Sequence, residues 1–434
     1  MMPIDPAGAS PKVLFLSGLQ IYPTMSGGTL RSAALVNALQ HHGFDVRVHS
    51  LTGRKADYLA RRPSSMQVWP GGTEERVDRG VASAANWLAG YVLGLPPVWI
   101  SAHLGVAVGS PGEALLSAAL RQELAWCDAI VADFPYLYPI FAAPAAQGKL
   151  RVLSTHNIEH HLWRNPLTRA VVRELEIQAA KACDILVACC AEDARFFEAN
   201  AGVRQAVVVP NGVDLGRFCG IEAHRAEARR ALGIADDVML LLFTASKWGP
   251  NREAFEYLLE FAKSQARLLV EQRIHILVVG GVTAEPVHLE GFTATGRIDR
   301  VEPYFAAADA ALNPISSGAG TNVKMCEFIA MRLPIVSTPF GARGLAFQDA
   351  KSGFLFEKGG LAAVLSKVRR LFDENPLRLR EIAEDAYAQN RNAIDMNACA
   401  QVLVEAMGPA RERLGLRGHG TPPAEAPAAG GLRA

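Results

Sequence analysis

The stretch that decides the fold is Ala311-Leu-Asn-Pro-Ile-Ser-Ser-Gly-Ala-Gly-Thr-Asn-Val-Lys-Met-Cys-Glu-Phe-Ile-Ala-Met-Arg-Leu-Pro-Ile-Val-Ser-Thr338. Its pattern predicts an apolar strand over 310–312, a glycine-rich loop over 316–321, a helix, and a second apolar strand over 334–337. A helix that begins directly after such a loop presents unpaired backbone N–H groups and the positive end of its dipole, and this attracts phosphate. Glu327, further along the helix, could bind a ribose or sugar hydroxyl beside that phosphate. The stretch therefore predicts half of a nucleotide-sugar site.

Composition places the chain among globular proteins of more than one domain. It has 434 residues, half of them apolar and one fifth charged, and such a length favours two or three domains. The net charge of +1 provides no overall basic field, which argues against nucleic acid as the main partner. The seven cysteines form no Cys-x-x-Cys pair and no metal-ligand spacing with histidine, so we expect reduced core thiols in a reducing compartment.

Neither a membrane span nor a signal peptide is expected. No run approaches the roughly 18 uninterrupted apolar residues of a membrane helix. The apolar segment that begins at Lys12 has no basic segment before it, and a helical pattern follows it at once, so it is predicted to be a first buried strand. We expect a cytoplasmic protein, with peripheral attachment at the inner face of the cell membrane left open.

Both halves of the chain alternate short apolar runs with amphipathic helical patterns, which is typical of parallel α/β sheets. The predicted fold is α/β, with two doubly wound Rossmann-like domains that face each other across a cleft. Strands are predicted over 13–17, 46–51, 129–132, 150–155, 185–188 and 206–209 in the first half, and over 238–245, 274–279, 292–295, 310–312, 335–337 and 354–356 in the second. Residues 54–112 are read as irregular.

The predicted boundaries follow from these patterns. They are an N-terminal domain over 1–213, a linker over 214–236, a second domain over 237–390, a C-terminal helix over 391–414 and a disordered Pro/Ala/Gly-rich tail over 415–434. Ligands of such folds bind outside the carboxyl ends of the strands. The residues that follow each strand are therefore the candidates for a site.

Three strand ends carry residues suited to binding a sugar phosphate. Gly27 and Gly28, after the first strand, would let the backbone approach a ligand closely at a helix start. His156 follows the strand that ends at Thr155 and could form a hydrogen bond with a ligand. Lys247 and Arg252 flank a Gly-Pro turn before a helix, where they could clamp a diphosphate.

Each of these motifs has a simpler interpretation. The double glycine could be only a flexible turn, and a cation pair beside a turn is commonly surface charge. The run from His156 to His161 suggests a metal, but adjacent His160 and His161 cannot both point at one ion from one helix or strand. We therefore expect no metal and place His160 and His161 in solvent. The chain has no phosphate loop of the Gly-x-x-x-x-Gly-Lys-Ser/Thr type, and its glycine loop lacks the third glycine of a dinucleotide fingerprint, so nucleotide hydrolysis and dehydrogenase chemistry are disfavoured.

Taken together, these motifs resemble the retaining glycosyltransferases of GT-B fold and family 4 type, over nearly the whole chain. The resemblance rests on the glycine pair, the Lys247/Arg252 loop, the run Val208-Val-Pro-Asn-Gly-Val-Asp-Leu-Gly-Arg-Phe218, the segment 296–309 and the opening stretch. The family has two glutamates with seven residues between them, and Ala319 stands at the first of these positions. A subgroup with a Gly-x-Gly-Thr-x-x-Lys loop resembles this chain more closely.

The resemblance implies a transfer of sugar from a UDP- or GDP-sugar to a glycan or lipid-linked acceptor, in polysaccharide or glycolipid biosynthesis, without a metal or other cofactor. It implies catalytic roles for Lys247, Arg252 and His156. It implies contacts with the sugar donor from Glu327, Gly318, Gly320, Thr321, Lys324, Arg297, Gly27 and Gly28. The acceptor would dock on the N-terminal domain, onto which the C-terminal helix would cross back.

Two other functions remain open from the sequence. Ala319 motivates a nucleotide-sugar-binding protein without transfer activity, which would bind nucleotide but release none from a sugar donor. A nucleotide-sugar epimerase on the same fold would change the sugar without an acceptor.

Overall fold

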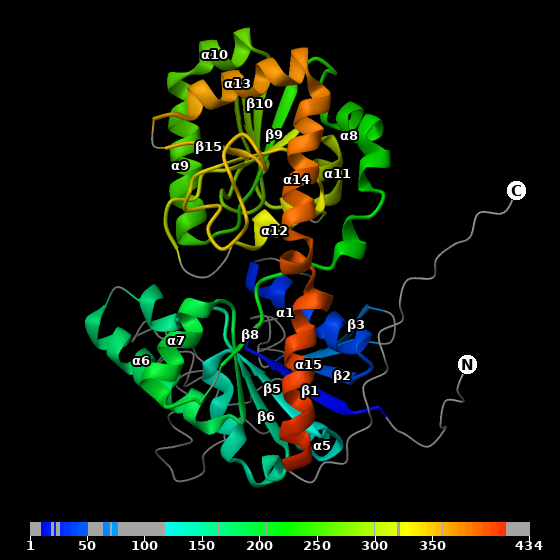
Figure 1. Ribbon diagram of the computed structural model, residues 1–434, viewed down its shortest axis with the longest axis vertical. Coiled ribbons are helices and arrows are strands. Elements are labelled where there is room, and N and C mark those ends of the chain that lie inside the picture. Colours follow the sequence, from blue (N-terminus) through cyan, green and yellow to red (C-terminus); the bar gives the residue numbers. More distant parts are fainter. Residues whose placement is uncertain are drawn as a thin grey trace, which may run out of the picture.

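The computed structural model describes residues 10–18, 21–22, 27–50, 64–69, 72–76, 118–163, 165–204, 206–298, 300–318, 322–357 and 359–413. Two sheets, each flanked by helices, lie one above the other (Figure 1). The predicted α/β fold with two Rossmann-like domains is confirmed. The tail predicted over 415–434 lies outside the described residues, as does most of 54–112.

The first sheet has eight strands in the order β3-β4-β2-β1-β5-β6-β7-β8. They are β1 (Lys12–Ser17), β2 (Asp45–Ser50), β3 (Ser64–Trp69), β4 (Gly72–Arg76), β5 (Ala129–Asp133), β6 (Leu150–Ser154), β7 (Ile185–Ala188) and β8 (Val207–Val208). All neighbours pair in parallel except β3 with β4. The six predicted strands are confirmed. The irregular reading of 54–112 is wrong for β3 and β4, because an antiparallel hairpin at the end of a sheet need not show the apolar runs of central parallel strands.

The second sheet has seven strands in the order β11-β12-β10-β9-β13-β14-β15. They are β9 (Met239–Thr244), β10 (Ile274–Val279), β11 (Val287–Leu289), β12 (Phe292–Ala294), β13 (Ala310–Asn313), β14 (Ile335–Ser337) and β15 (Phe354–Leu355). The six predicted strands are again present. The further strand in this sheet, β11, was not predicted; it is a short antiparallel edge strand whose side chains are largely exposed.

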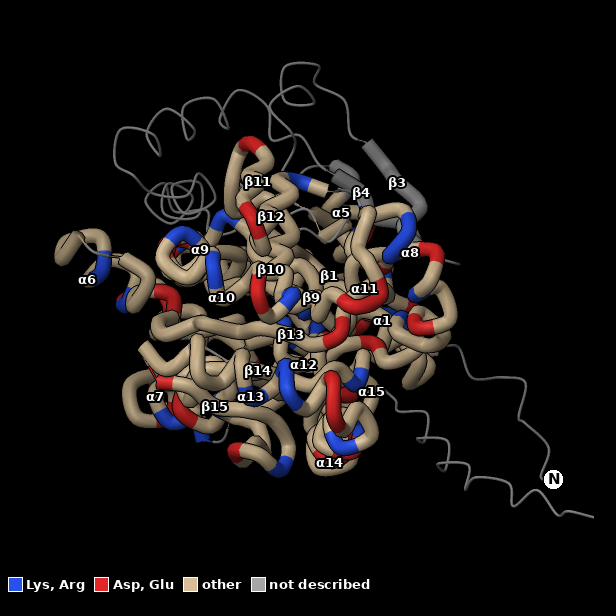
Figure 2. The backbone as a smooth tube through the Cα atoms, turned by 90° about the horizontal axis from the view of Figure 1, so that it is seen from above, with Lys and Arg blue, Asp and Glu red and all other residues tan. Residues whose placement is uncertain are grey.

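Helices cover both faces of each sheet. The first domain has α1 (Gly27–His41), α5 (Ala118–Trp126), α6 (Pro166–Ala182) and α7 (Ala191–Ala201). The second has α8 (Arg225–Leu232), α9 (Gly249–Ser264), α10 (Ala266–Glu271), α11 (Glu302–Ala307), α12 (Val323–Ala330), α13 (Leu361–Glu374) and α14 (Pro376–Ile394), and α15 (Met396–Arg413) follows at once. Lys and Arg alternate with Asp and Glu over the described backbone rather than collecting on one side (Figure 2).

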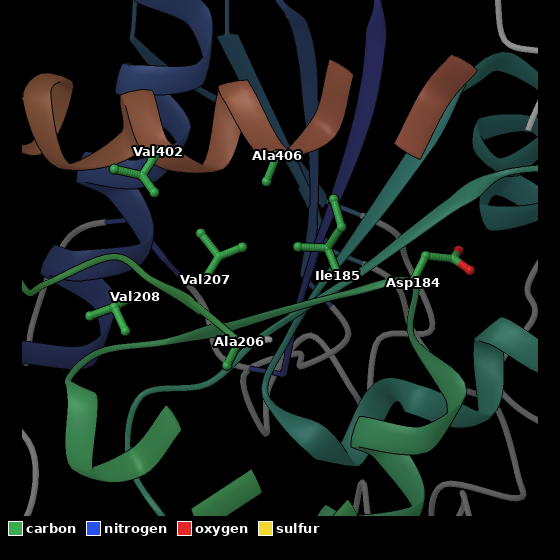
Figure 3. A pocket seen from close by; sticks show the side chains of 7 residues that line it. All are labelled: Asp184, Ile185, Ala206, Val207, Val208, Val402 and Ala406. Carbon is green, nitrogen blue, oxygen red and sulfur yellow. The ribbon is translucent and has the colours of Figure 1, made fainter. Parts of the chain in front are cut away.

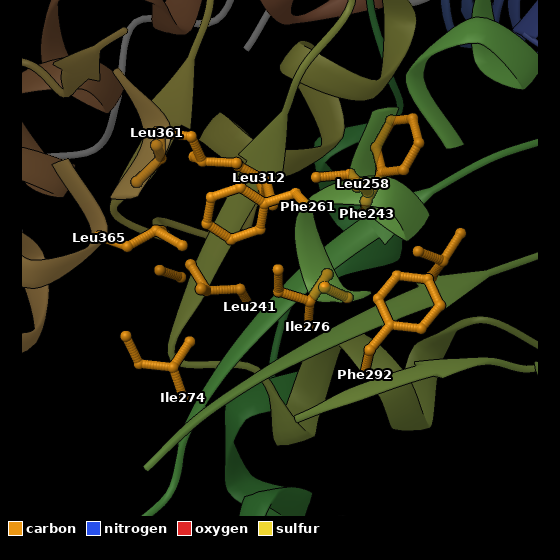
Figure 4. Packing of buried hydrophobic residues seen from close by; sticks show 14 of the residues in the cluster. Leu241, Phe243, Leu258, Phe261, Ile274, Ile276, Phe292, Leu312, Leu361 and Leu365 are labelled. Atoms are coloured by element: carbon orange, nitrogen blue, oxygen red, sulfur yellow. The ribbon is translucent and has the colours of Figure 1, made fainter. Parts of the chain in front are cut away.

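Central strands of the second domain pack apolar side chains in two clusters, one on each face of the sheet, and Leu240 and Leu277 meet Phe328 of α12 in one of them. In the second domain Leu241, Ile276 and Leu312 meet Leu258 of α9 and Leu365 of α13, and all are fully buried (Figure 4). Burying one such side chain contributes about 1.5–3 kcal/mol. This packing explains why continuous apolar runs of four to six residues mark the strands of both domains.

The helix α15 leaves the second domain and packs on the first sheet, beside α1 and β6 to β8 (Figure 1). Its buried side chains belong to the same apolar cluster as Val13, Phe15 and Val131; they are Met396, Cys399, Ala400, Leu403, Val404 and Met407. This helix is therefore part of the core of the first domain although it ends the described chain.

The two connections between the domains are joined by backbone hydrogen bonds. The N–H of Val213 donates to the carbonyl of Ile394 at 2.7 Å, and the N–H of Met396 donates to the carbonyl of Val213 at 3.0 Å. A β-carbon on Gly212 would lie 2.8 Å from the carbonyl oxygen of Ile394. The glycine of the Pro-Asn-Gly run thus lets the two connections touch.

We predict that Gly212→Ala lowers the free energy of unfolding by about 1–3 kcal/mol, the typical cost of forcing an extra methyl into a packed site. Urea unfolding followed by circular dichroism measures it. Gly408→Ala is the matched control, because nothing lies within 4 Å of the added carbon and alanine favours the helix. Equal midpoints for the two variants would contradict the prediction.

Candidate functional site

The carboxyl ends of the two sheets face each other, and a helix begins at each. A β-carbon on Gly27, the first residue of α1, would lie 3.6 Å from Cγ2 of Val323, the first residue of α12. The starts of α1 and α12 are therefore brought together. Two positive helix ends meet there, which favours an anionic ligand. Ala319, Gly320 and Thr321 lie outside the described residues.

Lys324 projects from the first turn of α12 into a neutral setting. Its ammonium donates to Oδ1 of Asn251 at 2.5 Å and lies 4.5 Å from the centroid of the Phe243 ring. Burial lowers the pKa of Lys324 to about 7, and the neighbouring carboxylate of Glu327 opposes that shift. An anionic ligand beside Lys324 would oppose this shift and keep its side chain protonated.

Glu327 lies one turn further along α12 and is 5% exposed. Its Oε1 is 3.7 Å from a guanidinium nitrogen of Arg217, which itself donates to Glu302 at 3.2 Å. Burial raises the pKa of Glu327 to about 7, while Arg217 and Lys324 pull it down. Arg217 belongs to the 3-10 turn Leu215–Phe218 just after the first domain crossing, so this contact ties the site to the connection between domains.

The two cations predicted to bind phosphate, Lys247 and Arg252, lie in the loop after β9 and at the start of α9, and they are more exposed than Lys324. Lys247 and Arg252 are both exposed. The Nε of Arg252 donates to Glu256 at 3.1 Å, and its side chain is 76% exposed. In the described structure Arg252 thus pairs along its own helix, whereas Lys247 remains in the loop beside the site.

Gly318 packs against the same loop. Its φ of +123° is one that side chains rarely adopt, and a β-carbon there would lie 2.8 Å from Cη2 of Trp248. The Ser317 hydroxyl donates to Glu253 at 2.5 Å. The two strand-end loops of the second domain are therefore in direct contact. Arg297 follows β12, which is next to the edge strand β11, and its side chain is exposed.

His156 sits at the end of β6 in a buried hydrogen-bonded chain. Its Nε2 is 2.7 Å from Oδ1 of Asp133, and the Ser32 hydroxyl of α1 donates to Oδ2 of Asp133 at 2.6 Å. The ring stacks on Phe134, with centroids 4.1 Å apart. Phe134 has a φ of 94°, a strained value for a residue with a side chain. The strain is the cost of turning Phe134 onto the histidine ring.

The placement of His160 in solvent is wrong. His160 is 6% exposed, and its Nδ1 is 2.7 Å from Glu176 of α6. Glu176 also accepts the backbone N–H groups of Glu159 and His160, and burial raises its pKa to about 8. The loop after His156 therefore needs a buried carboxylate to pair its backbone groups, and nothing in the local sequence signals that need. His161 is exposed, as expected.

Three polar residues of this arrangement are not among the candidates that the sequence predicts. Asn251 lies in the first turn of α9, and Asp133 is the last residue of β5. Ser32 sits one turn into α1, where a hydroxyl gives no signal of its partner. Ligands of such folds bind at the carboxyl ends of the strands. Asp133 is the last residue of β5 and Asn251 lies in the helix after β9, so this rule could have identified both.

Among the described residues, a cysteine cluster borders His156 and a cavity lies away from the site. Ligand atoms of Cys189, Cys190 and Asp193 fall within 4.8 Å of one another, but the Cys189 thiol already donates to Asp193 and to the carbonyl of His156. A cavity of about 450 Å³ is lined by Asp184, Ile185, Ala206, Val207, Val208, Val402 and Ala406 (Figure 3). It lies at the amino ends of β7 and β8, opposite to the edge where such folds bind ligands. None of the described helices is long and apolar enough to cross a membrane.

We predict that Glu327→Gln stabilises the unliganded protein more at pH 8 than at pH 5. The folded pKa of about 7 exceeds the ordinary 4.5, so the folded state binds more protons between these values and the wild type loses stability as the pH rises. Between pH 5 and pH 8 the free energy of unfolding of the wild type falls by up to about 3 kcal/mol through this group. Calorimetric midpoints at both pH values measure it, with Glu384→Gln, whose carboxyl is exposed, as control. A variant-minus-wild-type difference independent of pH would contradict the prediction.

Comparison with known proteins links this geometry to sugar transfer. Residues 25–217 match the family model described as "Glycosyltransferase Family 4", and residues 239–374 match "Glycosyl transferases group 1". A D-inositol 3-phosphate glycosyltransferase of Geodermatophilus obscurus is 29% identical over 262 residues, 55% of each chain. A putative teichuronic acid biosynthesis glycosyltransferase of Bacillus subtilis is 26% identical over 198 residues, 45% of this chain and 49% of the relative. The chain thus spans about half the length of the curated relatives it matches.

Solved structures share the fold over nearly the whole chain. The Anabaena HepE protein in complex with UDP and glucose superposes with a TM-score of 0.62 at 16% identity and covers 92% of this chain and 100% of its own. A sucrose-phosphate synthase of Thermosynechococcus elongatus gives 0.61 at 14% identity, with 93% and 100% covered. With one glycosyltransferase model on each domain and this shared architecture, the chain is a member of the glycosyltransferases of GT-B fold.

Proposed function

We propose that the protein transfers a sugar from a UDP- or GDP-sugar to a hydroxyl of a glycan or lipid-linked acceptor, with retention of the anomeric configuration. One observation carries the proposal. The first residues of α1 and α12, Gly27 and Val323, lie close together. The ammonium of Lys324 lies beside them, next to an uncharged amide and an aromatic ring. A diphosphate supplies the negative charge that this arrangement lacks.

The reaction would break the bond between the anomeric carbon and the β-phosphate oxygen, so negative charge grows on the departing diphosphate. Lys324 and the N–H groups at the start of α12 would stabilise that charge, with Lys247 assisting from its loop. Removing one such group typically raises the barrier by about 3 kcal/mol. The acceptor hydroxyl attacks from the same face and its proton passes to the leaving phosphate oxygen, so neither a metal nor a protein nucleophile is required.

Two buried groups would orient the sugar donor. Glu327 would accept a hydrogen bond from a ribose hydroxyl. Its carboxyl is buried one turn after Lys324 in α12. His156 would face the sugar from the first domain. Because its Nε2 is engaged by Asp133, Nδ1 is the ring nitrogen left for a substrate hydroxyl. Gly27 and Gly28 would let the backbone of α1 approach the phosphates and the acceptor.

The relatives guide the choice of substrates. The HepE structures hold UDP, UDP-glucose, or UDP and glucose, and one curated relative is assigned to teichuronic acid biosynthesis. We propose by analogy a uridine or guanosine sugar donor and a role in polysaccharide or glycolipid assembly at the cytoplasmic face of the membrane. Ala319, in place of the first family glutamate, favours the second candidate, a nucleotide-sugar-binding protein without transfer activity.

The test is incubation with a panel of UDP-, GDP- and ADP-sugars and with glycan and lipid-linked acceptors, followed by detection of free nucleoside diphosphate. Scanning calorimetry with the same nucleotides identifies the base, because bound ligand raises the unfolding midpoint. Acceptor-dependent release with an α-configured product from an α-configured donor supports the proposal. Nucleotide binding without release from any donor would favour the binding protein, and altered donor without acceptor would indicate the epimerase.

We predict that Lys324→Met lowers kcat about 100-fold, because it removes one cation from the departing diphosphate. Arg252→Ala should lower kcat by less than about tenfold, since Arg252 would have to leave Glu256 to reach the phosphates. Steady-state rates with the preferred donor measure both. Lys263→Met, an exposed change in the last turn of α9, is the control. A larger loss for Arg252→Ala than for Lys324→Met would refute this ranking.

A further inference from the structure

We infer that Asn251 is the positioning residue for Lys324, holding its ammonium toward the diphosphate with an uncharged partner so that its positive charge remains for the ligand. The inference rests on the proposed function and adds to it a residue with no role in the motifs above. Asn251 lies in the first turn of α9 and is 5% exposed.

The amide of Asn251 is oriented from both ends. Its Nδ2 donates to the carbonyl and to the hydroxyl of Ser246, at 3.2 and 3.1 Å. An ammonium can only donate, so the atom that faces Lys324 at 2.5 Å must be Oδ1. The side chain therefore cannot turn over without losing hydrogen bonds on both sides. Asn251 joins the residue before Lys247 to the first turn of α12.

The surroundings explain why an amide suits this position. The ammonium of Lys324 contacts an amide oxygen and the face of the Phe243 ring, and neither carries a formal charge. Of the charged groups in the described structure, Glu327 on the same helix acts on the pKa of Lys324, and Glu327 is itself drawn toward Arg217. A carboxylate at position 251 would form a full ion pair with Lys324. That pair would neutralise the cation before a diphosphate arrives.

The contact between the two loops gives Asn251 a second effect. Gly318 packs on Trp248, and Ser317 bonds to Glu253, on either side of Asn251 in the sequence. The Lys324–Asn251 hydrogen bond is partly buried and starts from the same turn of α9 as these contacts. Displacing the amide would therefore move the cation relative to the glycine-rich loop as well as reorient it.

The experiment compares wild type, Asn251→Ala and Asn251→Asp by calorimetric titration with UDP, GDP and inorganic pyrophosphate from pH 6 to 9. Lysine labelled with 13C at Cε reports the titration of Lys324 by NMR, with Lys324→Met giving the assignment. Asn390→Asp is the control, because Asn390 is equally buried and bonds through both amide atoms to the backbone at Ala346.

For Asn251→Ala we expect affinity for diphosphate to fall about tenfold or more, as on loss of a hydrogen bond to a charged group. For Asn251→Asp we expect the titration of Lys324 to move to higher pH while affinity for pyrophosphate falls. A residue with a purely structural role would change the unfolding midpoint but not this titration, and Asn390→Asp should behave that way.

An unchanged Lys324 titration in Asn251→Asp, or wild-type diphosphate affinity in Asn251→Ala, would overturn the inference. Failure of the wild type to bind any of the nucleotides or pyrophosphate would instead overturn the proposed function. The NMR titration distinguishes the two failures, because it needs no ligand and reports the contact between Asn251 and Lys324 directly.

Discussion

The arrangement of the whole molecule depends on the backbone pairing of Val213 with Ile394 and Met396. Here the chain enters the second domain and returns from it, and the two connections touch because Gly212 has no side chain. This pairing holds the carboxyl edges of the two sheets toward each other. Since parallel α/β sheets bind ligands at that edge, one hydrogen-bonded crossing brings the halves of the site together.

Burial has a larger effect than neighbouring charges on the pKa values of Lys324 and Glu327. Lys324 and Glu327 lie on one face of α12 and are shifted in opposite directions, so the pKa of each lies near 7. Exposed cations on the neighbouring loop keep their usual hydration, and Arg252 pairs with Glu256. In the proposed function a diphosphate would therefore gain more from the partly buried ammonium than from the exposed guanidinium, because burial weakens the competition from water.

Buried polar chains support both halves of the site. In the first domain Ser32 and Asp133 hold His156, and Glu176 pairs the backbone of the loop that follows. In the second domain Asn251 joins Ser246 to Lys324. Each chain links residues of two or three separate elements, so it restricts the position of a binding group. Phe134, whose φ of 94° is strained, stacks its ring on that of His156 and so restricts the histidine further.

The order of strands and helices was predictable from the sequence, because central parallel strands are buried on both faces and leave continuous apolar runs such as 239–244 and 274–279. The glycine loops, Lys324, Glu327 and His156 were also identifiable, since each follows a strand. The strands β3, β4 and β11 were not, because strands of antiparallel hairpins at the end of a sheet need not show a continuous apolar run. Burial of His160, the partnership of Asp133 with Ser32 and the amide contact of Asn251 required the tertiary structure. Their partners are 16 to 101 residues away, and only packing decides which polar groups lose water and must pair with each other.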